Sequence, residues 1–140
     1  MSISERWRHH ETLPEEIRQR LQTLPDLLRA RGVRLAYLFG SLAHAGSGQD
    51  VDIALLTIEE PAYQLRDAIT QWLDTERVDI IDLRRASPVF RMEIIETGVP
   101  LYEADDDVRL DFELRTMREY RDTAYLRRQQ ETLLRSRLTQ

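Results

Sequence analysis

Hydrophobic residues along this chain switch between helical spacing and short apolar runs, which indicates helices and strands in succession. The first helix is expected to begin near Leu13, after a capping box of Thr12 and Glu15. It should break or restart at Pro25 and end at Gly32, where a left-handed stop is natural. Its helically spaced apolar residues are Ile17, Leu21 and Leu24.

Short apolar runs bounded by glycine or charge predict four strands, over 33–39, 50–56, 77–83 and 99–102. An amphipathic helix is expected over 60–74. Another helix is expected over 88–97, entered through Ser87 and Pro88 and ended by Gly98. Strands that alternate with helices in this way predict an α+β fold, a small mixed β-sheet flanked by helices.

A long C-terminal helix is expected from 106 to about 135, with acidic residues first and arginines last, as the helix dipole favours. Its expected core stripe consists of Leu110, Leu114, Met117 and Ala124. A second stripe of Leu126, Leu133 and Leu134 either docks a partner or packs on its own domain. Tyr120 and Tyr125 are expected to be packing or partner-contact residues.

Composition limits the possible chemistry. The chain has 140 residues, which fits one domain over 1–140 with a core over about 13–104. It contains no cysteine and no lysine, which excludes disulfides, thiolate metal sites and lysine nucleophiles. The net charge of -5 argues against general nucleic-acid binding. Without an apolar membrane span or a signal-peptide segment, a cytoplasmic protein with no membrane association is expected.

Two aspartates on the second strand are the first candidates for chemistry. Alternation along a strand directs Asp50 and Asp52 to one face of an otherwise apolar segment, where two ionised carboxylates repel each other unless a cation lies between them. A divalent metal ion satisfies that requirement. The alternative is a strand end whose aspartates face water or cap a turn, and the pair alone does not decide between the two.

The end of the first strand supplies a phosphate-binding candidate. Backbone N–H groups after Gly40, together with the Ser41 hydroxyl, suit phosphate oxygens, although an ordinary turn fits the two residues as well. Antiparallel neighbouring strands bring this turn beside Asp50 and Asp52. The third strand adds Asp79 or Asp82, and a parallel crossover places Asp79 nearer the site.

These segments resemble a known family. GSLAHAGSGQDVDIALL and the later RVDIIDL are similar to the nucleotidyltransferase signature, and VPLYEAD and REYRDTAYLRR resemble the minimal nucleotidyltransferase (MNT) group of the DNA polymerase beta-like superfamily. Departures occur at His44-Ala45, where the group usually has Arg-Gly, and at Gln49, where it usually has Ser.

The resemblance implies a nucleotidyltransferase fold and metal-dependent protein adenylyltransferase activity. Proteins of this group move AMP from ATP to a tyrosine of a partner HEPN toxin and act as its antitoxin. Asp50, Asp52 and Asp79 would be catalytic and hold two Mg²⁺ ions, while Gly40 and Ser41 would bind the nucleotide. The resemblance also implies that the protein forms a hetero-oligomer with the toxin. Two alternatives stay open, namely an antibiotic-type nucleotidyltransferase acting on a small molecule and an inert antitoxin that neutralises by binding alone.

Overall fold

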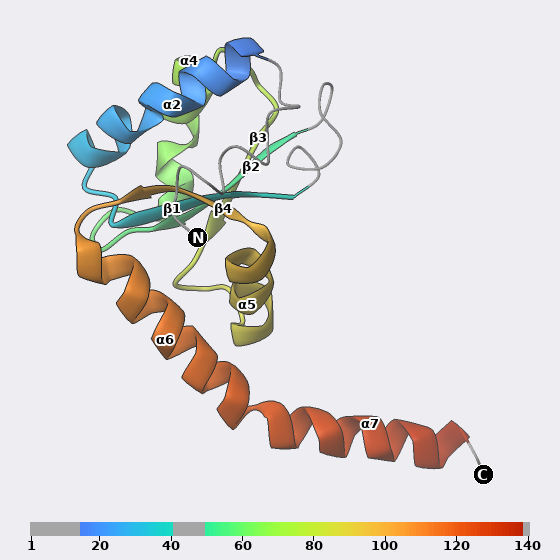
Figure 1. The fold of residues 1–140 in the computed structure, drawn as a ribbon. Coiled ribbons are helices and arrows are strands. Elements are labelled where there is room, and N and C mark those ends of the chain that lie inside the picture. Colours follow the sequence, from blue (N-terminus) through green and yellow to red (C-terminus); the bar gives the residue numbers. More distant parts are fainter. Residues whose placement is uncertain (1–14, 41–49, 139–140) are drawn as a thin grey trace.

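The structure is a computed structural model, and it describes residues 15–40 and 50–138. A four-stranded sheet in the order β3-β2-β1-β4 lies at its centre, with helices on both faces (Figure 1). β1 runs antiparallel to β2 and β4, whereas β3 runs parallel to β2, which confirms the mixed sheet. The strands are β1 (Leu35–Phe39), β2 (Val51–Leu56), β3 (Val78–Asp82) and β4 (Val99–Glu103). The helices are α2 (Glu15–Ala30), η1 (Ala62–Leu65), α4 (Arg66–Leu73), α5 (Pro88–Thr97), α6 (Asp106–Asp122) and α7 (Ala124–Leu138).

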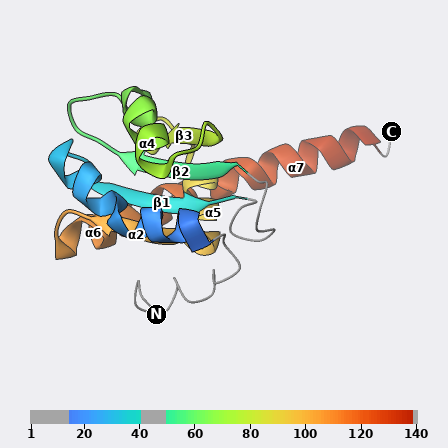
Figure 2. The ribbon, with the colours of Figure 1, turned by 90° about the horizontal axis from the view of Figure 1, so that it is seen from above.

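The sheet separates two apolar layers, because successive side chains of a strand point to opposite faces. Ile53 and Leu55 of β2 belong to the cluster under α2 and α4, whereas Ala54 and Leu56 belong to the cluster that faces α5 and α6. Figure 2 shows from above that α4 lies toward β3 while α2 lies toward β1. Helices therefore cover both faces of the sheet, so a site open to substrate is expected at the ends of the strands.

Pro25 does not interrupt the first helix, contrary to the prediction. α2 continues from Glu15 to Ala30 with Pro25 inside it. A proline in a helix interior costs about 3 kcal/mol, but the helix buries Leu21, Leu24 and Leu28 on either side of it. Burial of three leucine side chains contributes about 5 to 9 kcal/mol, so packing outweighs the local penalty. Gly32 ends the segment at φ +72°, as expected. The predicted start at Leu13 lies outside the described residues.

The long C-terminal helix is present but bent, and the bend at Thr123 divides it into α6 and α7 (Figure 1). Thr123 donates its hydroxyl proton to the carbonyl of Tyr120 at 3.0 Å, a local bond that competes with the helix ladder. Arg127 secures the bend, since its guanidinium lies 4.1 Å from the centre of the Tyr120 ring and hydrogen-bonds the Tyr120 carbonyl. Tyr120 thus contacts Arg127 at the bend while its side chain stays exposed, so packing and partner contact both remain open for it.

The predicted core stripe of the last helix is wrong. Leu110, Leu114 and Met117 are 55%, 44% and 41% exposed, whereas Phe112 and Thr116 are buried. α6 turns the Phe112 side toward the sheet because Phe112 packs on Tyr37, with ring centres 6.3 Å apart.

Within 15–40 and 50–138, no helix is long and apolar enough to cross a membrane.

Candidate active site

The end of β1 and the start of β2 meet at one edge of the sheet. Phe39 is the antiparallel partner of Asp52, so Gly40 follows directly beside that aspartate. Gly40 has φ +83°, and a Cβ atom built on it would lie 2.0 Å from Oδ2 and 2.9 Å from Cγ of Asp52. Only glycine tolerates this conformation and this approach. The backbone of Gly40 therefore packs on the Asp52 carboxylate, as the sequence predicted for the two segments.

The parallel register of β2 and β3 gives the two aspartates of the third strand different neighbours. Asp79 is the partner of Asp52, and both belong to the face that carries Ala54 and Ile81. Asp82 lies three positions further, on the opposite face. Its carboxylate accepts a 2.9 Å hydrogen bond from the backbone N–H of Arg84 and ion-pairs with the same arginine. Asp79, not Asp82, is thus the neighbour of Asp52.

Asp50 directly precedes β2 and is exposed, two residues from Asp52. Among the described residues there is no group of three or more His, Cys, Asp or Glu side chains that could by itself hold a metal ion. The chain still fits Mg²⁺, which prefers oxygen ligands and is usually held by one or two carboxylates together with substrate phosphates. The juxtaposed Asp52 and Asp79 supply such a pair. Ser41, His44 and Gln49 lie outside the described residues.

Sequence reasoning missed a pocket beside this edge. Its volume is about 270 Å³, and it is lined by Phe39, Gly40, Phe90, Glu93, Ile94 and Thr97. The four residues from α5 are spaced i, i+3, i+4 and i+7, which places them on one face of the helix. That spacing was visible in the sequence, but only the fold brings this face next to Gly40.

A glycine turn packed on a carboxylate at the edge of a mixed sheet, with a second carboxylate on the next strand, has the features of a metal-assisted transferase of phosphoryl or nucleotidyl groups. A family model described as "Polymerase beta, Nucleotidyltransferase" matches residues 22–107. The chain belongs to this family.

The chain is similar to an adenylyltransferase and to toxin-antitoxin structures. The chain is 33% identical over 94 residues to the protein adenylyltransferase MntA of Shewanella oneidensis, an alignment that covers 63% of this chain and 66% of that relative. A crystal structure of a toxin-antitoxin with AMP-PNP matches with a TM-score of 0.64 at 26% identity, covering 84% of this chain and 98% of that one. A tri-AMPylated Shewanella oneidensis HEPN toxin in complex with an MNT antitoxin matches with a TM-score of 0.61 at 26% identity, covering 87% and 98%.

Proposed function

We propose that this protein is an antitoxin that transfers AMP from ATP to a tyrosine hydroxyl of a partner HEPN toxin. The observation that carries the proposal is the row formed by Gly40, directly after β1, Asp52 on β2 and Asp79 on β3. Membership in the nucleotidyltransferase family supports the reaction class. A similar protein named an adenylyltransferase and a similar complex that contains an AMPylated toxin support the acceptor.

The roles of the residues follow from their places in this row. Asp50 and Asp52 hold Mg²⁺ together with the nucleotide phosphates. Backbone N–H groups after Gly40 and the Ser41 hydroxyl bind phosphate oxygens. Asp79 lies on the far side of Asp52 from Gly40, and it therefore faces the acceptor hydroxyl as a metal ligand or as the general base.

When bound, the metal supplies electrostatic stabilisation of the attacking and leaving oxygens. The acceptor oxygen attacks the α-phosphorus, the bond to the bridging oxygen breaks, and pyrophosphate leaves. The proton of the hydroxyl passes to the base on the Asp79 side. Transfer is direct, and it requires no covalent adduct on this chain.

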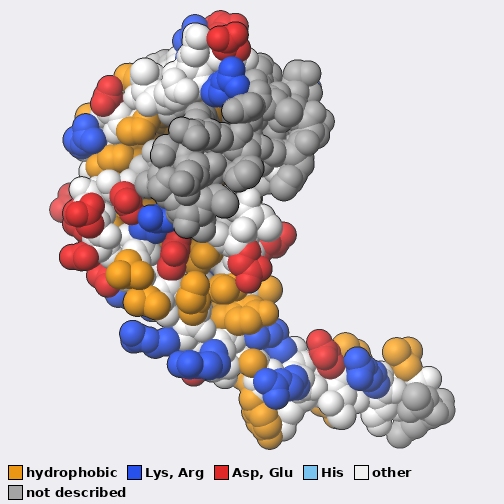
Figure 3. Space-filling model, in the orientation of Figure 1, with side chains coloured by type: hydrophobic (Ala, Val, Ile, Leu, Met, Phe, Trp, Pro, Cys, Tyr) orange, Lys and Arg blue, Asp and Glu red, His pale blue; other side chains and the backbone are white. Residues whose placement is uncertain are grey.

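The far end of the molecule supports a protein partner. α7 buries none of its residues, although a helix of this length is only marginally stable in water on its own. It exposes Tyr125, Leu126, Leu133 and Leu134. Figure 3 shows hydrophobic side chains gathered over α5 and α6 and arginines farther along α6 and α7. A helical partner with an acidic surface complements this combination of leucines and arginines, and a HEPN toxin, which is helical, is the occupant that we propose.

The test is to incubate the full chain with labelled ATP and Mg²⁺, with and without the product of the adjacent gene, and separately with an aminoglycoside. Label on a tyrosine of that protein is the expected result. The double substitution Asp50→Asn with Asp52→Asn should abolish transfer, whereas Asp67→Asn, at an exposed position on α4, should not. Label on an aminoglycoside instead, or tight association without any label, contradicts the proposal.

A further inference from the structure

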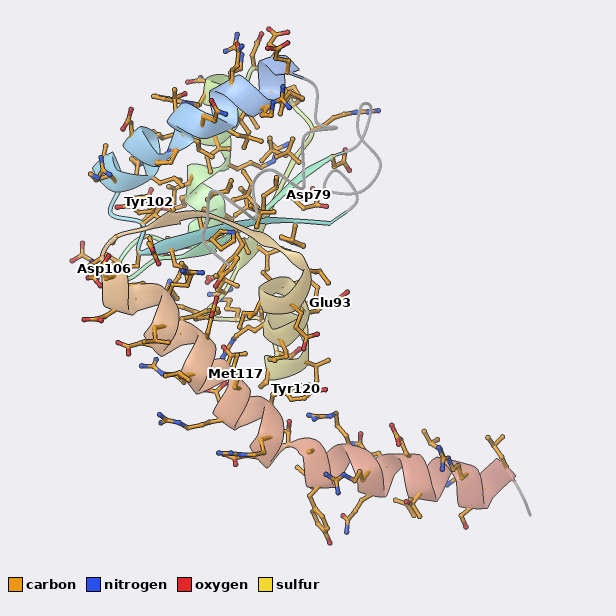
Figure 4. The ribbon with its side chains drawn as sticks, viewed as in Figure 1. Asp79, Glu93, Tyr102, Asp106, Met117 and Tyr120 are labelled. Atoms are coloured by element: carbon orange, nitrogen blue, oxygen red, sulfur yellow. The ribbon has the colours of Figure 1, made fainter. Side chains whose placement is uncertain are left out.

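The pocket beside Gly40 combines aromatic walls with an acidic rim. The rings of Phe39 and Phe90 meet edge to face, with centres 5.9 Å apart and planes at 88°. Glu93 and Thr97 line the same pocket from α5. Glu93 is exposed, and Figure 4 shows it on α5, below the same end of the sheet that carries Asp79. Flat apolar walls and a few placed polar groups are typical of a site for a ring system.

The pocket adjoins the candidate active site on a defined side. Phe39 is the register partner of Asp52 and shares its face of the sheet. In the strand order β3-β2-β1, Asp79 lies on one side of Asp52 while Phe39 and Gly40 lie on the other. The acceptor approaches on the Asp79 side under the proposed function. The pocket is therefore on the side where the nucleotide is bound.

We propose that this pocket holds the base of the nucleotide and that Glu93 accepts a hydrogen bond from the exocyclic amino group of that base. The inference rests on the proposed function. A volume of about 270 Å³ lies just below the roughly 300 Å³ at which pockets for whole small ligands begin. It therefore suits one flat ring system rather than an entire nucleotide. Phe39 and Phe90 supply aromatic surface for stacking, which every base accepts.

The polar side chains that line the pocket favour a ligand that donates hydrogen bonds. An ionised carboxylate only accepts hydrogen bonds. The Thr97 hydroxyl donates its proton to the backbone carbonyl of Glu93 at 2.7 Å, so its remaining capacity is also that of an acceptor. Bases that carry an amino group match such a wall. A base without one leaves the carboxylate unpaired toward the ligand, and it is bound more weakly.

The test compares ATP with purine riboside triphosphate, which lacks only the 6-amino group, by titration calorimetry on the full chain in Mg²⁺. The wild-type protein should bind ATP about tenfold more tightly, the lower range for a hydrogen bond to a charged group because Glu93 is exposed. Glu93→Ala should remove this difference by weakening ATP alone. Glu96→Ala, an exposed glutamate of the same helix outside the pocket, should preserve it.

A second variant tests the aromatic wall. Phe90→Leu keeps an apolar side chain but removes the ring, so it should weaken both nucleotides severalfold and leave their ratio unchanged. If Glu93→Ala still binds ATP more tightly than purine riboside triphosphate, the proposed base site is overturned. The binding of ATP would then still support the proposed function. If Glu93→Ala changes only the KM for the acceptor protein, the pocket binds the acceptor, and this result also overturns the proposed base site. If neither nucleotide binds the wild-type chain, the proposed function fails together with the pocket.

Discussion

Replacement of Gly40 by alanine tests the contact on which the candidate site depends. The new Cβ atom would lie 2.0 Å from Oδ2 and 2.9 Å from Cγ of Asp52, and the residue would keep φ +83°. A left-handed conformation costs a residue with a Cβ about 1 to 2 kcal/mol. Displacement of a packed neighbour adds about 1 to 3 kcal/mol. Gly40→Ala should therefore lower the free energy of unfolding by about 2 to 5 kcal/mol.

The chain contains its own control for the backbone contribution. Gly32 has φ +72°, but a Cβ atom there meets nothing within 4 Å. Gly32→Ala should consequently lower the free energy of unfolding by only the conformational share, about 1 to 2 kcal/mol. Urea denaturation of the two variants, with equal m-values, isolates the clash with Asp52 as their difference.

Function should respond even more clearly than stability. A displacement of the Asp52 carboxylate by about 1 Å is expected to lower the transfer rate about 100-fold in Gly40→Ala, whereas Gly32→Ala should leave the rate unchanged. In an Asp52→Ala background, most of the extra cost of Gly40→Ala should disappear, because the two closest atoms are gone. Equal stability and equal rates in the two glycine variants would refute the placement of Asp52 against Gly40.

Three further outcomes are expected. Asp79→Asn should reduce the transfer of labelled AMP by at least about 100-fold while Asp82→Asn reduces it less than about threefold, and the reverse order would assign the third carboxylate to Asp82. Tyr37→Phe removes the 2.7 Å hydrogen bond from the buried phenol to Glu113 and should lower the free energy of urea unfolding by about 1.5 to 3 kcal/mol; an unchanged midpoint contradicts this role. Leu114→Asp should weaken toxin binding at least tenfold in calorimetry with unchanged thermal stability, since Leu114 is exposed. Unchanged affinity would exclude this side of α6 from the interface.

The strands were predictable because their apolar runs are short and bounded by glycine or charge. The same periodicity predicted Asp52 at the start of β2, directly after Asp50, and the expected parallel crossover favoured Asp79 over Asp82. The register of β2 with β3 agrees with that preference, since Asp52 pairs with Asp79 while Leu55 pairs with Asp82. Register depends on which residues meet across strands, and a single sequence does not contain that information directly.

Other features depended on tertiary contacts that local spacing does not encode. Pro25 predicts a helix break, but the leucines around it bury enough apolar surface to continue α2. The pocket at Gly40 required α5 to lie beside the end of β1, a juxtaposition set by the fold and not by either segment alone. The sequence therefore predicted that Asp52 and Asp79 lie on neighbouring strands, but it did not predict the pocket beside them.

α6 shows why the predicted core stripe failed and what the failure means for function. The helix has apolar residues on two sides, and helical periodicity fits the Leu110, Leu114 and Met117 side at least as well as the side with Phe112. Phe112 is the residue that is buried, because its ring packs against Tyr37 on the face of the sheet that α5 and α6 cover. The remaining stripe stays in solvent and leads along the helix toward the leucines and arginines of α7. A second apolar side that the core does not use is what a helix bound by a partner protein requires, and this supports the proposal that α6 and α7 carry the toxin interface.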